Sequence, residues 1–336
     1  MLNGTVRGTS LRQACSLIPR VSKDAWRASS FAARWLIASR APVLVMTFSS
    51  AAVGGVLAGL DGRVDGIAWA LCVVGLLLAH ATNNQLNDFT DSALGIDRGN
   101  YFRNRYGAHV LEDGLLSRRQ LFVSIALTGA VALAIGAYLS LRIGPAVLWP
   151  LGAGAFFLLF YTYPLKRLGF GEIAVLLVWG PLMTGGSYLA ATGTWSGWAA
   201  LIGVVQALPP TTVIFGKHID KLTFDAAKGI RTLPVRLGAG PARAVVIGML
   251  ALPYVCVPLF VILGRLPWTA LVVFAALPNA IRVSRTFRAK PPAMCPPGYP
   301  ADVWPLWYSA HAFAHARAFG LLLLAGLLTA WITGSR

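Results

Sequence analysis

Long apolar runs alternate with short polar connections along most of the chain. Nine of these runs are close to twenty residues long, which is the length an α-helix needs to cross the hydrocarbon core of a bilayer. We expect spans at residues 41–60, 67–87, 121–141, 145–163, 173–192, 198–216, 244–263, 267–287 and 311–332. The pattern predicts an all-α polytopic membrane protein built as a nine-helix transmembrane bundle.

Composition and charge agree with this class and give it an orientation. Of 336 residues, 56% are hydrophobic and 12% are charged, and the formal net charge is +17. Of 29 Lys and Arg residues, 24 lie before the first span or in and beside every second connection, against four on the other side. This bias predicts a cytoplasmic N-terminus, an outer C-terminus and a multi-pass protein of the cell (inner or plasma) membrane. Anionic lipid then explains the basic excess better than nucleic acid does.

The first forty residues are rich in Ser, Arg and Ala, with Asp24 as the only acid. They lack the apolar core of a cleavable signal peptide, and the mixture of Trp26, Arg27, Phe31 and Arg34 predicts an interfacial helix. We expect a basic extension over residues 1–40 and one transmembrane domain over residues 41–333. An organelle-import segment is the weaker alternative to a bacterial extension.

A dense polar stretch ends the second apolar run, and such groups at a membrane span favour a functional role. On a helix, Asn84 and Asp88 share a face, as do Asn87 and Asp91. Clustered carboxylate and amide oxygens suit Mg²⁺, which is held by one or two carboxylates together with substrate phosphates.

The connection after this stretch continues the mixture of acids and bases. It carries Asp97, Arg98 and Arg103. Long connections without clear structure are often functional. We therefore expect a basic flap over an anionic substrate; the plainer reading is an ordinary cytoplasmic loop whose charges set topology.

The connection between spans four and five is short and basic. Its Lys166 and Arg167 are expected on the same membrane side as the polar stretch, so they either contact a diphosphate or only set topology. Glu172 opens the next span and is expected to cap that helix rather than to face the site.

A second polar stretch ends the sixth span. Asp220 and Asp225 lie five residues apart, so on an ideal helix they sit about 140° apart. Both can bind one metal only if the helix breaks near Thr223; otherwise Asp220 acts indirectly. His218 and Lys221 share a helix face with Asp225, and Arg231 follows in the same connection.

Acids, amides and bases gathered at one membrane face suit a substrate with an anionic head and a long hydrocarbon tail, such as a polyprenyl diphosphate. Two polar stretches facing each other would form a metal–diphosphate site. A transporter is a remote alternative, since it would place charges near the midplane within inverted repeats.

The two polar stretches resemble the aspartate motifs of the UbiA superfamily of intramembrane prenyltransferases. The resemblance rests on Asn87-Asp88-x-x-Asp91-x-x-x-Gly95-x-Asp97 and Asp225-x-x-x-Gly229-x-x-Thr232-Leu233-Pro234. The segments Tyr163-Pro164-Leu165-Lys166 and Gly169-x-Gly171-Glu172 look most like the MenA branch, which prenylates 1,4-dihydroxy-2-naphthoate on the way to menaquinone.

The resemblance implies Mg²⁺ held between the motifs, and it implies a role for each matching residue. Asn87, Asp91 and Asp225 match metal-side positions, Asp88 and Asp97 match supporting positions, and Lys166 matches a lysine near the diphosphate. The sequence departs from the family in its second motif.

The family spacing would place an aspartate at position 221, where this chain has Lys221 and carries Asp220 one residue earlier. Asp220 is therefore the less secure metal candidate, and His218 or Lys221 could contact or deprotonate a phenolic acceptor.

The expected activity is Mg²⁺-dependent transfer of a polyprenyl group to an aromatic acceptor, with 1,4-dihydroxy-2-naphthoate as the leading acceptor. A terpene cyclase of the same superfamily, or transfer to another acceptor, is the alternative. The expected partners are polyprenyl diphosphate, the aromatic acceptor and the bilayer, with no nucleic acid and no evident protein partner.

Overall fold

A computed structural model describes residues 7–16, 20–97 and 106–335, and this part of the chain contains helices and no strand. The helices before the third membrane span are α1 (Leu11–Ser16), α2 (Lys23–Ala28), α3 (Phe31–Ala38), η1 (Ala41–Val43), α4 (Leu44–Leu60) and α5 (Gly66–Ala93). The next are α6 (Arg118–Ile143), η2 (Pro145–Val147), α7 (Leu148–Phe160), η3 (Tyr161–Leu165), α8 (Gly171–Leu177), η4 (Val178–Gly185) and α9 (Gly186–Thr192). The last are α10 (Gly197–Asp220), α11 (Leu222–Ala227), α12 (Leu233–Leu237), α13 (Ala239–Ile262), η5 (Trp268–Ala276), α14 (Leu277–Arg288) and α15 (Tyr308–Thr333).

The nine expected spans are confirmed. The described residues contain nine helical segments long and apolar enough to cross a membrane, and their ends lie within six residues of the expected ends. The largest difference is in α5, which runs on to Ala93 and so keeps the whole first polar stretch helical. Three short helices lie in the described part of the first forty residues, and α2 and α3 begin where the Ser22 and Ser30 hydroxyls accept backbone N–H groups.

The chain forms two compact units, each made of segments distant in sequence. Unit 1 comprises Met1–Val45, Leu78–Val131 and Pro292–Leu306, and unit 2 comprises Met46–Leu77, Ala132–Pro291 and Trp307–Arg336. Helices α5 and α6 each run through both units. The single transmembrane domain expected over residues 41–333 stays a prediction.

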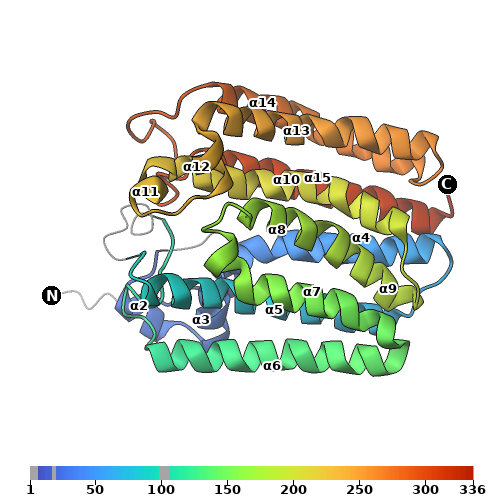
Figure 1. The fold of residues 1–336 in the computed structure, drawn as a ribbon, viewed down its shortest axis with the longest axis horizontal. Helices are drawn as coiled ribbons and strands as arrows, with labels where there is room; N and C mark the ends of the chain where they lie inside the picture. The colour runs from blue at the N-terminus through green and yellow to red at the C-terminus, as the bar shows by residue number, and fades with distance from the viewer. Residues whose placement is uncertain (1–6, 17–19, 98–105, 336) are drawn as a thin grey trace. The chain divides into compact units, whose positions relative to one another are not determined.

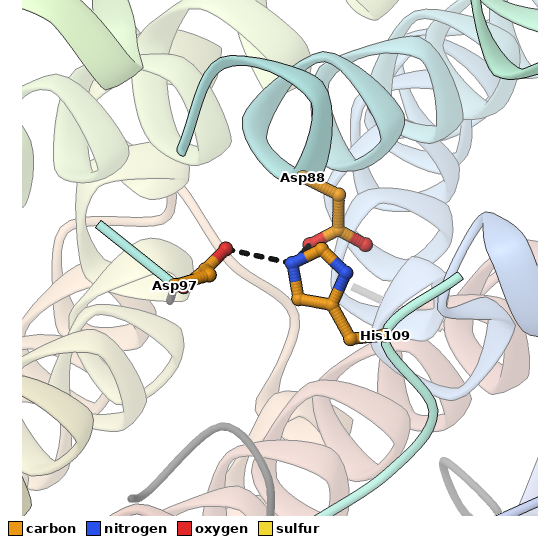
Figure 2. Close-up of side chains that lie close together, drawn as sticks. All are labelled: Asp88, Asp97 and His109. Atoms are coloured by element: carbon orange, nitrogen blue, oxygen red, sulfur yellow. Dashed lines mark hydrogen bonds and ion pairs between the residues drawn. The ribbon is translucent and has the colours of Figure 1, made fainter. Parts of the chain in front are cut away.

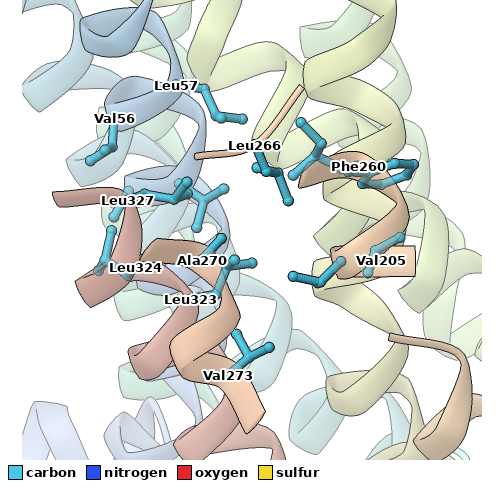
Figure 3. Packing of buried hydrophobic residues seen from close by; sticks show 14 of the residues in the cluster. Val56, Leu57, Val205, Phe260, Leu266, Ala270, Val273, Leu323, Leu324 and Leu327 are labelled. Atoms are coloured by element: carbon cyan, nitrogen blue, oxygen red, sulfur yellow. The ribbon is translucent and has the colours of Figure 1, made fainter. Parts of the chain in front are cut away.

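Unit 2 is organised around α10. This helix packs against α8, η4, α13 and α15, and Figure 1 shows α10 and α15 running side by side. Figure 3 shows the core between α4, α10, α13, η5 and α15, filled by aliphatic side chains and Phe260. Small residues let the backbones approach: a Cβ on Gly203 would lie 2.7 Å from the Gly180 carbonyl oxygen. In lipid, such close packing replaces the hydrophobic driving force between helices.

The first turn of α5 is fixed in unit 2 by Asp65. Its carboxylate accepts the backbone N–H groups of Ile67 and Ala68 and pairs with Arg142 at 2.7 Å. The bond from Ala68, together with Arg142, holds the pKa of the Asp65 carboxyl below its usual value. This pairing stabilises the start of α5 within unit 2.

Unit 1 has its own apolar core beneath the polar end of α5. Trp26, Ile37, Val110, Leu115 and Leu121 are buried in it, and they come from α2, α3, the segment before α6 and α6 itself. The α3 end is tied to α5 because the Ser39 carbonyl accepts the Asn84 amide N–H at 2.9 Å. Unit 1 therefore presents the first polar stretch on a packed support.

Candidate functional site

The first motif is an uninterrupted part of α5. Asn84, Asn87, Asp88 and Asp91 all lie on this helix and are all buried. The i, i+4 pairs expected from the sequence are therefore confirmed as neighbours on one helix. The Asn84 amide is used to hold α5 against α3, as its bond to Ser39 shows. Asn87 and Asp91 are one turn apart, and together they offer amide and carboxylate oxygens on one face.

Asp88 and Asp97 meet a histidine that sequence analysis did not single out. Figure 2 shows Asp97 and His109 joined, with Asp88 beside the imidazole ring. The Asp97 Oδ2 to His109 Nε2 distance is 2.7 Å, and Asp88 Oδ1 lies 3.9 Å from the same nitrogen. Asp88 also forms an ion pair with Arg40, which precedes the first span in a left-handed backbone conformation.

The hydrogen bonds identify the imidazole tautomer. His109 Nδ1 accepts the backbone N–H of Glu112 at 3.3 Å, so the ring proton lies on Nε2 and is donated to Asp97. Ser92 adds a parallel tie by donating its hydroxyl to Glu112 at 2.7 Å. The segment that begins near residue 106 is thus hydrogen-bonded to the last turn of α5 through Ser92, and to the residues just after α5 through Asp97.

The three side chains Asp88, Asp97 and His109 have ligand atoms within 4.8 Å of one another, a spacing that could hold a metal ion. The Arg40 guanidinium and the His109 N–H already contact these two carboxylates. The contacts describe a support that holds Asp88 and Asp97 in place, whereas Asn87 and Asp91 present the oxygen donors typical of a Mg²⁺ site.

The second motif lies where a helix breaks. Helix α10 ends at Asp220, Lys221 has non-helical dihedral angles (φ −108°, ψ 10°), and α11 starts at Leu222. The expected break near Thr223 therefore occurs two residues earlier. It separates the two aspartates into different helices.

The Asp220 carboxylate caps another helix. Its two oxygens accept the backbone N–H groups of Trp307, Tyr308 and Ser309 at 3.1, 3.0 and 3.1 Å. These are the residues where α15 begins. An acid at a helix N-terminus satisfies donors that have no partner within the helix. This contact favours the indirect role among the two that the sequence left open for Asp220.

Asp225 is buried, and with Asp220 capping α15 its carboxylate is the stronger metal candidate of the second motif. Its Oδ1 lies 3.4 Å from the Lys221 ammonium, one turn earlier in the chain. The following connection approaches the one between spans four and five, because the Arg231 N–H donates to the Arg167 carbonyl at 3.2 Å. Lys166 is buried nearby in sequence, and a Cβ on Gly171 would lie 3.2 Å from its Cα. The structure thus brings the two basic connections of unit 2 together.

His218 forms a buried pair with Glu172. The His218 Nδ1 to Glu172 Oε1 distance is 2.5 Å, and Glu172 Oε2 accepts the Leu233 N–H at 3.3 Å. The expectation that Glu172 caps α8 is wrong, since its hydrogen bonds go to α10 and to the start of α12. A carboxylate bonded to one ring nitrogen fixes the orientation of the imidazole. Arg98 and Arg103, the expected flap residues, lie outside the described residues.

Comparisons with known proteins agree with this picture. The sequence model of the UbiA prenyltransferase family matches residues 47–304. The chain is 26% identical to the UbiA prenyltransferase domain-containing protein 1 of Danio rerio, over 86% of this chain and 85% of the relative. It is 28% identical to the 1,4-dihydroxy-2-naphthoate octaprenyltransferase of Mycobacterium tuberculosis, over 86% and 98%. It is also 28% identical to the 2-carboxy-1,4-naphthoquinone phytyltransferase of Synechocystis, over 75% and 81%.

Solved structures have the same fold. A UbiA homologue from Aeropyrum pernix K1 matches with a TM-score of 0.64 and 21% identity, over 85% of this chain and 97% of the other. A UbiA homologue from Archaeoglobus fulgidus, solved bound to GPP and Mg²⁺, matches with a TM-score of 0.54 and 17% identity, over 87% and 99%. The family model covers well over half of the chain, which supports an enzyme and not the transporter alternative. The chain belongs to the UbiA prenyltransferase family and is a multi-pass membrane prenyltransferase.

Proposed function

We propose that the chain transfers a polyprenyl group from polyprenyl diphosphate to 1,4-dihydroxy-2-naphthoate with Mg²⁺ as cofactor. The observation that carries the proposal is the pair of buried oxygen-rich motifs, at Asn87–Asp91 and at Asp225, in a chain similar to naphthoate prenyltransferases. The A. fulgidus homologue bound to GPP and Mg²⁺ supports the choice of cofactor and of the diphosphate as donor.

The donor set fits Mg²⁺. Asn87 and Asp91 in the first motif, and Asp225 in the second, each offer hard oxygen atoms that would suit Mg²⁺, and Asp88 and Asp97 would keep the first motif in place. When bound, Mg²⁺ neutralises charge on the diphosphate and makes it a better leaving group. Asp220 remains the weaker metal candidate because its carboxylate already accepts three N–H groups of α15.

Basic side chains of this chain act on the departing diphosphate. Lys166, Arg167 and Arg231 lie in two connections that a backbone hydrogen bond joins. As the bond between the allylic carbon and its oxygen breaks, negative charge grows on the diphosphate, and these cations stabilise it. Arg98 and Arg103 stay predicted contributors to the same task. The apolar helices hold the prenyl tail and keep water from the allylic cation.

The acceptor reacts through a ring carbon, which becomes a stronger nucleophile when a phenolic proton leaves. The new carbon–carbon bond forms as the allylic carbon loses the diphosphate, and the attacked ring carbon then releases its proton, or its carboxylate as CO₂, to restore the aromatic ring. His218 is proposed to take this proton, with Glu172 holding the imidazole at 2.5 Å and balancing its charge. Lys221, beside Asp225, is proposed to contact the phenol oxygen.

The test incubates membranes containing the protein with labelled polyprenyl diphosphate and Mg²⁺, with and without 1,4-dihydroxy-2-naphthoate, and identifies products by mass spectrometry. We expect a prenylated naphthoid product that requires both the acceptor and Mg²⁺. Parallel reactions use 4-hydroxybenzoate as acceptor, and membranes containing Asp91→Ala as the control. A cyclised hydrocarbon formed without any acceptor would establish the cyclase alternative and overturn the proposal.

We also propose that the N-terminus and the connections bearing both motifs lie in the cytoplasm, because the Lys and Arg bias places them there. Two exposed free cysteines allow a direct measurement: Cys15 in the N-terminal segment and Cys295 in the connection before α15. A membrane-impermeant maleimide should label both in inside-out vesicles and neither in right-side-out vesicles. The reverse result would invert the orientation.

A further inference from the structure

A basic cavity lies in unit 1 between α2, α3 and the start of α6. Its volume is about 250 Å³, and its lining residues are Lys23, Trp26, Arg27, Arg34, Gly114, Leu115, Leu116 and Gln120. None of the residues assigned to prenyl transfer lines this cavity. It is therefore a separate feature of the molecule that needs its own explanation.

Three cationic side chains line the cavity, and among the described residues no acid lines it; Asp24, beside Lys23 on α2, forms no ion pair with them. Lys23 and Arg27 are exposed and one turn apart on α2. Within the described ranges, no hydrogen bond or ion pair involves the Lys23 ammonium or the Arg27 guanidinium. The Arg34 guanidinium donates to the carbonyls of Trp26 and Arg27, at 2.8 and 2.6 Å. These bonds hold Arg34 at the cavity and leave its charge unpaired.

The nearby acids of the loop are engaged elsewhere. The Glu112 carboxylate accepts the Ser92 hydroxyl at 2.7 Å, and the Asp113 carboxylate accepts the backbone N–H of His109 at 2.8 Å. Gly114 follows with a left-handed φ of 63°, and a Cβ there would lie 3.2 Å from the Lys23 ammonium. Glycine therefore makes both the turn and the space that the ammonium fills. The result is a cavity with a positive lining and no acidic side chain from the described part of the chain.

The cavity also has an apolar side, and it adjoins a membrane helix. Trp26 and Leu115 are buried in the core of unit 1 beside it. Phe31 is 84% exposed and lies one turn before Arg34 on α3. Gln120 belongs to the first turn of α6, a candidate membrane span. Cations with aromatic and aliphatic neighbours at the end of a span are typical of the membrane interface.

We propose that this cavity binds the phosphate group of an anionic phospholipid such as phosphatidylglycerol. Lys23 and Arg27 contact the phosphate oxygens from one helix face, and Arg34 adds charge from α3. The glycerol and upper acyl chains lie along Phe31 and the apolar lining. Such a lipid joins α2, α3 and the start of α6, and so fixes the N-terminal helices to the transmembrane domain.

The test uses the full-length protein, delipidated in a non-ionic detergent so that no charged surface contributes. Native mass spectrometry with added phosphatidylglycerol or phosphatidylcholine measures lipid bound per protein, and the melting temperature is followed in parallel. We expect one phosphatidylglycerol to bind more tightly than phosphatidylcholine. Lys23→Gln with Arg27→Gln should weaken phosphatidylglycerol binding by about tenfold and remove its effect on the melting temperature.

The matched control is Arg118→Gln with Arg119→Gln, which removes the same charge from exposed residues that do not line the cavity. It should leave binding within about twofold of the unmodified protein. Equal weakening in both double variants would show diffuse attraction and overturn the proposal, as would binding that ignores lipid charge. Inorganic phosphate is the third probe. If it alone raises the melting temperature, and the Lys23 and Arg27 variant loses that effect, the anion site stands with a soluble phosphate as its ligand.

Discussion

The two motifs place their acids by different physical means. In unit 1 the first motif belongs to one long helix, so the spacing of Asn87 and Asp91 is the helical repeat itself. In unit 2 the helix breaks at Lys221, and the two aspartates of the second motif have different contacts. Asp220 caps α15, whereas Asp225 is buried beside Lys221. Similar residues in a similar sequence context therefore do not have equal roles. The different polar partners of Asp220 and Asp225 account for their different roles.

The buried acids of both motifs also acquire cations differently. Asp88 pairs with Arg40, which is 48 positions away in sequence, whereas Asp225 has its lysine four residues earlier. In the first motif the acid paired with Arg40 is a neighbour of the proposed ligands Asn87 and Asp91. In the second motif the paired acid is itself the proposed ligand, so Lys221 and Mg²⁺ compete for it.

The largest expected effect comes from removing one proposed ligand in each motif. Asp91→Ala and Asp225→Ala should each lower Mg²⁺-dependent turnover by about 10²–10³-fold or more, since each removes a carboxylate proposed to hold the Mg²⁺ that would neutralise the diphosphate. Turnover is measured with labelled polyprenyl diphosphate, and the melting temperature reports folding. Asp65→Ala, a carboxylate at the opposite end of α5, is the matched control and should retain turnover. Full activity in either site variant would remove that motif from the mechanism.

Removing the histidine that supports the first motif should have a smaller effect. His109→Ala deletes the 2.7 Å contact with Asp97 and should raise the KM for the diphosphate by about 10- to 100-fold, as loss of a supporting partner typically does. His109→Gln keeps a donor at this place and should recover part of the loss. A kcat reduced with unchanged KM in both variants would contradict a positioning role.

Lys221 tests the competition within the second motif. Lys221→Gln should lower the Mg²⁺ concentration needed for half-maximal activity by up to about fivefold, since an ion pair of this kind contributes about 1 kcal/mol or less. Lys228→Gln is the control, because its ammonium lies over the Phe224 ring at 4.9 Å. If turnover falls while the Mg²⁺ dependence stays unchanged, Lys221 does not compete with the metal and contributes only through its proposed contact with the phenol oxygen.

Asp220 should affect stability more than chemistry. Asp220→Asn keeps one acceptor oxygen but loses the charge at the start of α15, and it should cost about 1 kcal/mol of unfolding free energy. The Mg²⁺ dependence of turnover should match that of the unmodified protein. A raised Mg²⁺ requirement without a lower melting temperature would return Asp220 to the metal site.

The local features of this fold could be read from the sequence. Hydropathy located the nine spans because each needs a run of fixed apolar length, and the helical repeat placed Asn87 over Asp91. The long-range pairs could not be read in this way. His109 with Asp97, Arg40 with Asp88, Glu172 with His218 and Asp220 with α15 each depend on which helices pack together, and hydrophobic periodicity does not specify that. One sequence signal pointed to His109: it lies in the same connection as Asp97 and is the first histidine after His80.

The contact between Asp220 and α15 also sets an order of events during biosynthesis. The ribosome completes the second motif well before it adds Trp307, Tyr308 and Ser309, the residues whose N–H groups the Asp220 carboxylate accepts. Until the final span is made and inserted, this half-buried acid lacks the partners that it has in the folded enzyme. Chains that terminate before α15 therefore contain every residue of both motifs but leave the acid at the end of α10 without the three N–H groups that it accepts in the complete fold.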